Sequence, residues 1–195
     1  MNMKNKKVEK ETSLLNAAFK LFTEKGIKNT SIQDIADEAG VGKGTFYLYF
    51  KDKFDLQEQL ITNKSNKLFT DALKEMESKK IVGFSDQIIF IINYIIDELA
   101  KNISLLKFIS KNLSFGLYNE KINKLIDNNG LGLKESFIKR IEAEKVDIEN
   151  PEVTLFMIIE LASSTCFSCI MKNEPLAIEE FKPHLYKAIR KLLEK

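Results

Sequence analysis

The segment AGVGKGTFYLYF, residues 39–50, raises the question that decides what this chain does. Three glycines at alternate positions, Gly40, Gly42 and Gly44, stand beside a lysine and a threonine and precede a run of aromatic residues. Glycine-rich segments with a lysine can bind nucleotide phosphates. Glycines also suit a tight turn between two short helices.

The spacing excludes a nucleotide loop. A Walker-type loop has four residues between its first glycine and Gly-Lys-Ser/Thr, and it follows a β-strand. Here Gly42 and Lys43 are followed by Gly44, and the preceding segment has a helical pattern. The dinucleotide pattern G-x-G-x-x-G fails too, because positions 45 and 47 are Thr and Tyr.

Upstream apolar residues have the spacing of one buried helical face. They are Leu15, Ala18, Phe19 and Phe22. We expect this helix to end at Gly26, since glycine readily takes the left-handed conformation common at helix ends.

A second helix of about nine residues is expected next, because Thr30 and Ser31 offer hydroxyl caps and Asp34 adds negative charge to the first turn. Its apolar positions are Ile32, Ile35, Ala36 and Ala39. After the glycine turn, Phe46 and Phe50 have the spacing of a third short helix. Short helices joined in this way are typical of a helix-turn-helix, here over about residues 31–50.

At these residues the chain resembles the TetR family of bacterial transcriptional regulators. The resemblance rests on the run GIKNTSIQDIA at 26–36, then residues 39–41, 44–47, 50 and 53–56, and it covers about residues 8–60. It implies an all-α fold with an N-terminal three-helix helix-turn-helix DNA-binding domain, residues 1–55. A C-terminal helical domain for ligand binding and dimerisation, residues 56–195, is expected to follow.

The resemblance also implies a function. It suggests a homodimeric repressor that binds an inverted repeat of double-stranded DNA and is released by a small effector, which we expect to be largely apolar. The competing hypothesis is a helical ligand-binding or protein-binding dimer that no longer reads DNA.

Eight residues are candidates for DNA contacts through this resemblance. Thr45, Tyr47 and Lys53 match family positions that contact phosphate, and the positions that touch bases or backbone are Gln33, Lys43, Gly44, Leu48 and Tyr49. A lysine that opens a recognition helix can donate to guanine O6 or N7, whereas hydroxyls suit phosphate contacts. The family often has His where Tyr49 stands and Glu where Phe54 stands.

Composition favours a helical, soluble protein. Of the 195 residues 44% are hydrophobic and 30% are charged, with 3 prolines and 8 glycines. Residues 1–53 hold ten lysines and seven acidic residues, a net charge of +3 within a chain of net charge +2. A charged start without an apolar stretch and two cysteines predict a cytoplasmic protein.

No enzyme constellation, cofactor or metal site is expected. The chain has one histidine, His184, and a single C-x-x-C pair, Cys166 and Cys169, which we interpret as buried thiols.

The remaining residues predict a series of helices. A long helix is expected from 56 to about 80, with a break at Gly83, and an apolar central helix around 87–97. The further helices are expected at 104–113, 118–145 with an interruption at 128–132, 151–172, and 178–194.

Candidate residues for the ligand pocket are mainly aromatic: Tyr94, Phe108, Phe115, Tyr118, Phe137 and Phe156, with Glu160 as a possible contact to a cationic ligand. Candidate dimer-interface residues lie in the last two predicted helices: Ser164, Ser168, Phe181, Leu185, Ala188 and Leu192. Plain core packing within one subunit would give the same two patterns.

Overall fold

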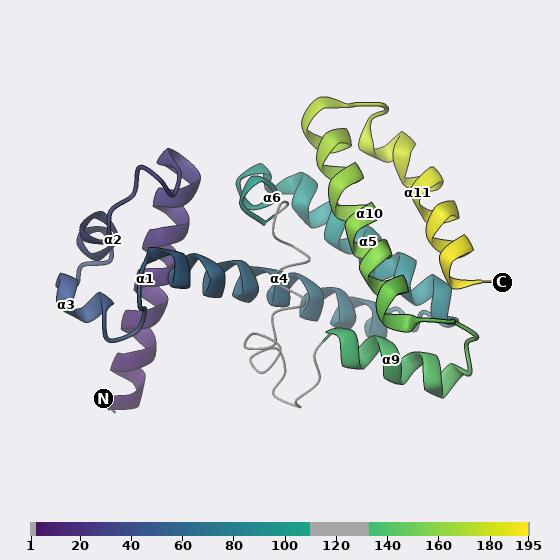
Figure 1. Ribbon diagram of the computed structural model, residues 1–195, viewed down its shortest axis with the longest axis horizontal. Helices are drawn as coiled ribbons and strands as arrows, with labels where there is room; N and C mark the ends of the chain where they lie inside the picture. Colours follow the sequence, from purple (N-terminus) through teal and green to yellow (C-terminus); the bar gives the residue numbers. More distant parts are fainter. Residues whose placement is uncertain (1–2, 110–132, 195) are drawn as a thin grey trace. The chain divides into compact units, whose positions relative to one another are not determined.

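The computed structural model describes residues 3–109 and 133–194, and within these ranges the regular structure is entirely α-helical (Figure 1). The chain divides into two compact units, Met1–Ile61 and Thr62–Lys195. The all-α expectation is confirmed.

The first unit consists of α1 (Met3–Lys25), α2 (Ile32–Glu38), α3 (Lys43–Phe46) and the first turns of α4 (Lys53–Ser78). α2 packs against both α1 and α3. Side chains from all four helices and from the loop after α3 close one apolar core: Leu14, Ala18, Ile35, Phe46, Phe50 and Leu56 are among its fully buried members.

The buried face of α1 differs from the predicted one. Leu14 is fully buried, whereas Leu15 and Phe19 are only partly buried. The inward row is Leu14, Ala17, Ala18, Leu21 and Phe22. Two apolar rows overlap on this helix, and packing against the neighbouring helices selects the row that starts one residue earlier.

Capping fixes both ends of the connection from α1 to α2. α1 ends at Lys25, and Gly26 takes a φ of 80°, as its position in the sequence predicts. The Asp34 N–H donates to Ser31 Oγ at 3.1 Å, and the Ser31 N–H donates to Asp34 Oδ2 at 2.9 Å. This reciprocal pair is a capping box. The Ser31 N–H and the Lys25 ammonium lower the pKa of Asp34 to about 2.

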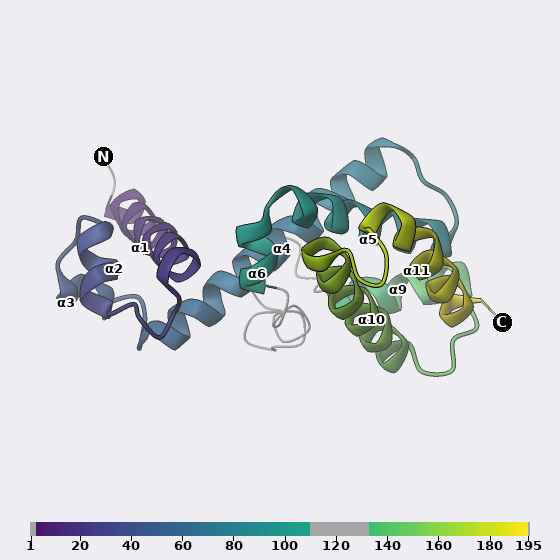
Figure 2. The same cartoon turned by 90° about the horizontal axis from the view of Figure 1, so that it is seen from above.

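The second unit contains the rest of α4 with α5 (Phe84–Lys101), α6 (Ile103–Ile109), α9 (Leu133–Glu144), α10 (Pro151–Lys172) and α11 (Ile178–Leu193). α10 contacts α11, α9 and α5 (Figure 2). The main core of this unit is built from α5, α9, α10 and α11, and it includes Ile96, Phe137, Ile158 and Ile189.

The observed helix ends agree closely with the predicted ones at α10 and α11, where Asn150 caps α10 by accepting from the Val153 N–H at 3.1 Å. α4 begins three residues before the predicted start, because Asp52 Oδ1 accepts hydrogen bonds from the Phe54 and Asp55 N–H groups. The predictions for residues 110–113 and 118–132 lie outside the described residues.

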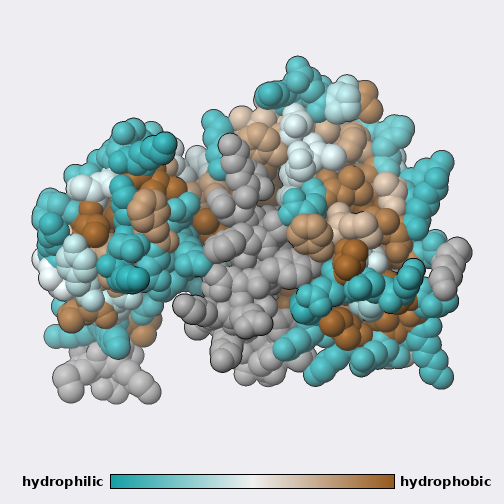
Figure 3. Space-filling model, in the orientation of Figure 1, coloured by the Kyte–Doolittle hydropathy of each residue, from teal (hydrophilic) through white to brown (hydrophobic). Residues whose placement is uncertain are grey.

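α10 is strongly apolar in composition but only partly buried. Among the helices that the structure describes, it alone is long and apolar enough to cross a membrane by length and composition, and 33% of its most apolar window is buried. Apolar side chains therefore reach the surface over α10 (Figure 3).

We predict that Ser31→Ala lowers the free energy of unfolding by about 1 kcal/mol, because the first turn of α2 loses its capping acceptor. Ser13→Ala is the matched control, since the Ser13 hydroxyl donates only to the Glu9 carbonyl of its own helix. Urea titration measures both variants. Equal stability of the two variants would contradict a stabilising role of the capping box.

Candidate nucleic-acid interface and apolar cavity

The segment after the glycine turn is held by two phenylalanines. Phe46 and Phe50 are fully buried, with ring centroids 5.6 Å apart. α3 is only four residues long, so Phe50 lies beyond its end rather than within a longer third helix. Between these anchors, Tyr47 is 54% exposed and Leu48 is 77% exposed. The fold thus fixes the backbone while it presents these two side chains outward.

Lys43 and Gly44 are exposed at the start of α3, and Thr45 and Tyr49 are half-buried. A Cβ built on Gly44 would meet no atom within 4 Å, and the backbone there is not left-handed. The folded chain itself therefore gives no reason for a glycine at position 44. Gly40, by contrast, has a φ of 67° in the turn between α2 and α3.

Gln33 lies exposed on α2, and its Nε2 donates to Asp37 Oδ1 at 2.7 Å. Of the eight candidates, Gln33 comes from α2, Lys53 from α4, and the other six from the segment 43–49. All eight belong to the first unit.

Lys53 has a structural role that the sequence did not reveal. Its Nζ donates to the carbonyl oxygens of Ile27 and Thr30, at 2.9 Å each. These bonds tie the start of α4 to the loop between α1 and α2. The ammonium also lies 5.7 Å from the ring centroid of Phe54.

We predict that Lys53→Met lowers the free energy of unfolding by about 1–2 kcal/mol, because two carbonyl groups lose a charged donor. Lys51→Met is the control at an exposed position two residues away. Thermal and urea unfolding without DNA measures both. If the two variants were equally stable, the carbonyl contacts would contribute nothing to the fold.

The second unit contains a partly open apolar cavity of about 110 Å³. Its walls come from α4, α5, α6, α9 and α10, and leucine, isoleucine and phenylalanine predominate. The α5 wall consists of Ile88, Ile91, Ile92, Ile95, Ile96 and Leu99. Several of these residues are only half-buried because they border this space, although the sequence predicts α5 to be buried on most sides. Apolar cavities of similar size stay dry and bind small apolar molecules.

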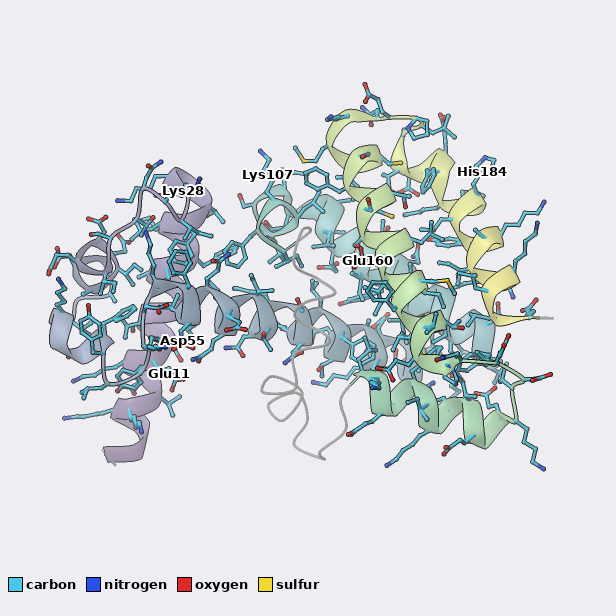
Figure 4. The ribbon with its side chains drawn as sticks, viewed as in Figure 1. Glu11, Lys28, Asp55, Lys107, Glu160 and His184 are labelled. Carbon is cyan, nitrogen blue, oxygen red and sulfur yellow. The ribbon has the colours of Figure 1, made fainter. Side chains whose placement is uncertain are left out.

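The predicted pocket residues are only partly brought together. Phe137 lines the cavity, whereas Tyr94, Phe108, Phe156 and Glu160 do not. Phe156 is exposed on α10. Glu160 is half-buried on the same helix, where Figure 4 labels it. Phe115 and Tyr118 lie outside the described residues. The predicted pocket residues were mainly aromatic, whereas the cavity walls are mostly branched aliphatic side chains.

Cys166 lines the cavity, and burial raises the pKa of its thiol to about 12. Burial also raises the pKa of Cys169, whose Sγ lies 3.6 Å from the Glu174 carbonyl oxygen. Both thiols are therefore protonated at neutral pH, which makes them poor nucleophiles. Within residues 3–109 and 133–194, no group of three His, Cys, Asp or Glu residues could hold a metal ion.

The candidate interface residues divide into two groups. Leu185 is fully buried within its own unit, on the inward face of α11 that also includes Lys182, Ile189 and Leu193. Ser164 is exposed, and the half-buried candidates are Ser168, Phe181, Ala188 and Leu192. Three apolar side chains of α10 are exposed and were not among the predicted interface residues: Val153, Phe156 and Met157. Their spacing of i, i+3 and i+4 places them on one helix face, which the sequence alone could have indicated.

Comparison with known proteins agrees with this arrangement. The family model for bacterial regulatory proteins of the tetR family matches residues 14–60. The uncharacterized HTH-type transcriptional regulator YhgD of Bacillus subtilis is 28% identical over 177 residues, which are 87% of this chain and 88% of that protein. YuxN of Bacillus subtilis, also an uncharacterized HTH-type regulator, is 42% identical over 65 residues, 33% of this chain and 22% of that protein.

Solved structures share the fold over almost the whole chain. A TetR-family regulator from Syntrophomonas wolfei has a TM-score of 0.69 at 20% identity, with 95% of each chain covered. The regulator FadR from Bacillus subtilis, solved in complex with stearoyl-CoA, has a TM-score of 0.64 at 19% identity, with 94% of this chain and 99% of that chain covered. The chain carries a DNA-binding domain of the tetR family of bacterial regulatory proteins at residues 14–60. It is a transcriptional regulator with a helix-turn-helix DNA-binding domain and not an enzyme.

Proposed function

We propose that the protein is a cytoplasmic, homodimeric repressor that binds an inverted-repeat operator and is released by an apolar ligand. Residues 1–55 would bind DNA, and residues 56–195 would bind the ligand and form the dimer. The observation that carries the DNA-binding role is the segment from Lys43 to Tyr49, which two buried phenylalanines hold while it exposes Tyr47 and Leu48.

Each exposed group in this segment suits a DNA contact. Lys43 can donate to guanine O6 or N7, and Leu48 can contact a thymine methyl group. Gly44 leaves open space at the surface, so bases can approach the backbone of α3. Thr45 and Tyr47 offer hydroxyls to phosphates, which positions the protein without reading sequence.

Three further candidates act within limits set by the fold. Lys53 donates to the carbonyls of Ile27 and Thr30 and, at 3.5 Å, of Lys28, so a phosphate would take the place of this longest contact. Gln33 exchanges its bond to Asp37 for a contact to DNA. Tyr49 is half-buried and contributes its outer edge.

Selection of random duplex DNA on the purified protein at about 0.15 M salt tests the proposal, because a dimeric reader enriches an inverted repeat. We predict that Lys43→Ala then costs about 1–3 kcal/mol and changes base preference, whereas Tyr47→Phe weakens binding about equally on all sequences. Competition titrations on operator variants measure both effects. A uniform loss for Lys43→Ala would remove its base-reading role.

The rival hypothesis of a dimer that no longer reads DNA predicts no enrichment. Protein purified with a bound inducer would give the same result, so the selection is repeated after unfolding, removal of small molecules and refolding. Enrichment only after this treatment supports the repressor, and no enrichment in either case supports the rival.

The dimer is proposed to form over α10 and α11. Val153, Phe156 and Met157 leave one face of α10 apolar and exposed, although the helix sits in a folded unit. A second copy of the same face covers it in a two-fold arrangement, as is usual for homodimers. Ser164 and Ser168 are small enough for close helix approach. On α11, the half-buried Phe181, Ala188 and Leu192 would extend the surface, although Phe181 and Leu192 also pack against the core of their own unit. Leu185 instead belongs to the core of its own unit.

We predict that Phe156→Glu raises the dimer dissociation constant at least about a hundredfold, because the two-fold interface buries two unpaired carboxylates. Val82→Glu is the matched control, since Val82 is apolar and 80% exposed between α4 and α5. Sedimentation equilibrium measures the association of both variants. Unchanged association of Phe156→Glu would place the interface elsewhere.

Ligand release is proposed to act through α4. This helix contributes Ser65, Leu68, Phe69 and Leu73 to the cavity, and it begins at Lys53 in the first unit. A ligand that binds better to one position of α4 shifts the dimer toward the matching separation of its DNA-binding units. An apolar ligand is supported by the cavity lining, and FadR of the same fold was solved with stearoyl-CoA.

A further inference from the structure

We propose that the cavity takes a single-chain amphiphile with an anionic head group, and that Arg140 holds the head group. The inference rests on the proposed ligand-binding function and names the chemical class of its ligand. It follows from the charge of the cavity walls, from their length and from the partners of Arg140.

Arg140 is the one charged side chain among the cavity-lining residues of the described segments. The other polar residues of the lining are three serines, Ser65, Ser136 and Ser163, and one cysteine, Cys166. The Arg140 side chain is half-buried beside this apolar lining, and a charged or polar partner stabilises a guanidinium in such a place. A bound anion would supply that partner.

The guanidinium of Arg140 is bonded to a neutral partner, so it can still bind an anion. Its Nη1 donates to Gln87 Oε1, a neutral acceptor at the start of α5. In the described segments no carboxylate lies within ion-pair distance of its guanidinium. The chain's other arginine, Arg190, is paired with both Asp86 and Glu194. A planar guanidinium with unused donors is suited to bind a carboxylate through two hydrogen bonds.

The two ends of the cavity differ in chemistry. Its α5 wall runs from Ile88 to Leu99, which is about 16 Å at 1.5 Å per residue. Arg140 lies at the Ile88 end, because it is bonded to the adjacent Gln87. The residues at the other end, Leu99, Leu106 and Ile109, are apolar. An elongated apolar wall of this kind suits an unbranched chain better than a ring system.

Ser65 provides a matched control in the same cavity. It is buried on α4, and its Oγ has no hydrogen-bond partner in the described segments. Ser65→Ala therefore changes the polarity of the wall without removing a charge. Lys139→Gln removes a neighbouring positive charge from α9 at an exposed position outside the lining.

The test is isothermal titration of the full-length protein with decanoate and with 1-decanol, which share a chain and differ in head-group charge. We expect decanoate to bind at least about tenfold more tightly than decanol, as a hydrogen bond to a charged group allows. Arg140→Gln should lose this preference and still bind decanol, which also reports that the variant is folded. Ser65→Ala and Lys139→Gln should keep the preference.

Equal binding of the two probes to the natural protein, or a preference that survives Arg140→Gln, would overturn the inference. Failure of both probes to bind would overturn it as well. The same titrations in the presence of the selected operator separate this inference from the proposed function. Preferential decanoate binding without loss of operator binding would leave the anion site standing and reject ligand-controlled release. Equal binding of decanoate and decanol together with release of DNA would reject the anion site and support ligand-controlled release.

Discussion

The burial of Phe46 and Phe50 is the constraint on which the DNA-binding role depends. These rings are fully buried in the first unit, whose other buried residues come from α1, α2 and the start of α4. α3 is a single turn, too short to keep its orientation by its own hydrogen bonds. Its position is therefore set by tertiary packing. A short segment anchored at both ends by large buried rings can expose polar and apolar groups between them at low conformational cost.

The second unit leaves part of its apolar side chains exposed, most clearly on α10. α5 packs on several helices and borders the cavity, while α10 faces the core with one side and solvent with another. Polar contacts add specificity to this apolar unit. Lys182 on α11 pairs with Asp97 on α5, and the Tyr186 hydroxyl donates to Asn93 Oδ1 at 2.5 Å, so that two helices are joined at fixed positions.

The sequence predicted the features that local chemistry determines. The end of α1 at Gly26, the capping of α2 by Ser31 and the start of α10 at Pro151 all follow from residue type and spacing. The inward row of α1 could not be predicted, since Leu14 and Leu15 begin two rows of similar apolar content and only the neighbouring helices distinguish them. The carbonyl contacts of Lys53 span 23 and 26 residues, and the cavity walls come from five helices. Such features depend on long-range packing, which no local pattern records.

The incomplete burial of α10 has a consequence for how this protein responds to dilution. If part of its apolar surface is covered only by a second copy, then subunit association contributes to the free energy of folding. The apparent stability then depends on protein concentration by mass action. A cell that holds few copies of the regulator would contain a larger share of separate, less stable subunits. The amount of the regulator and its lifetime would thus be linked through a single helix face.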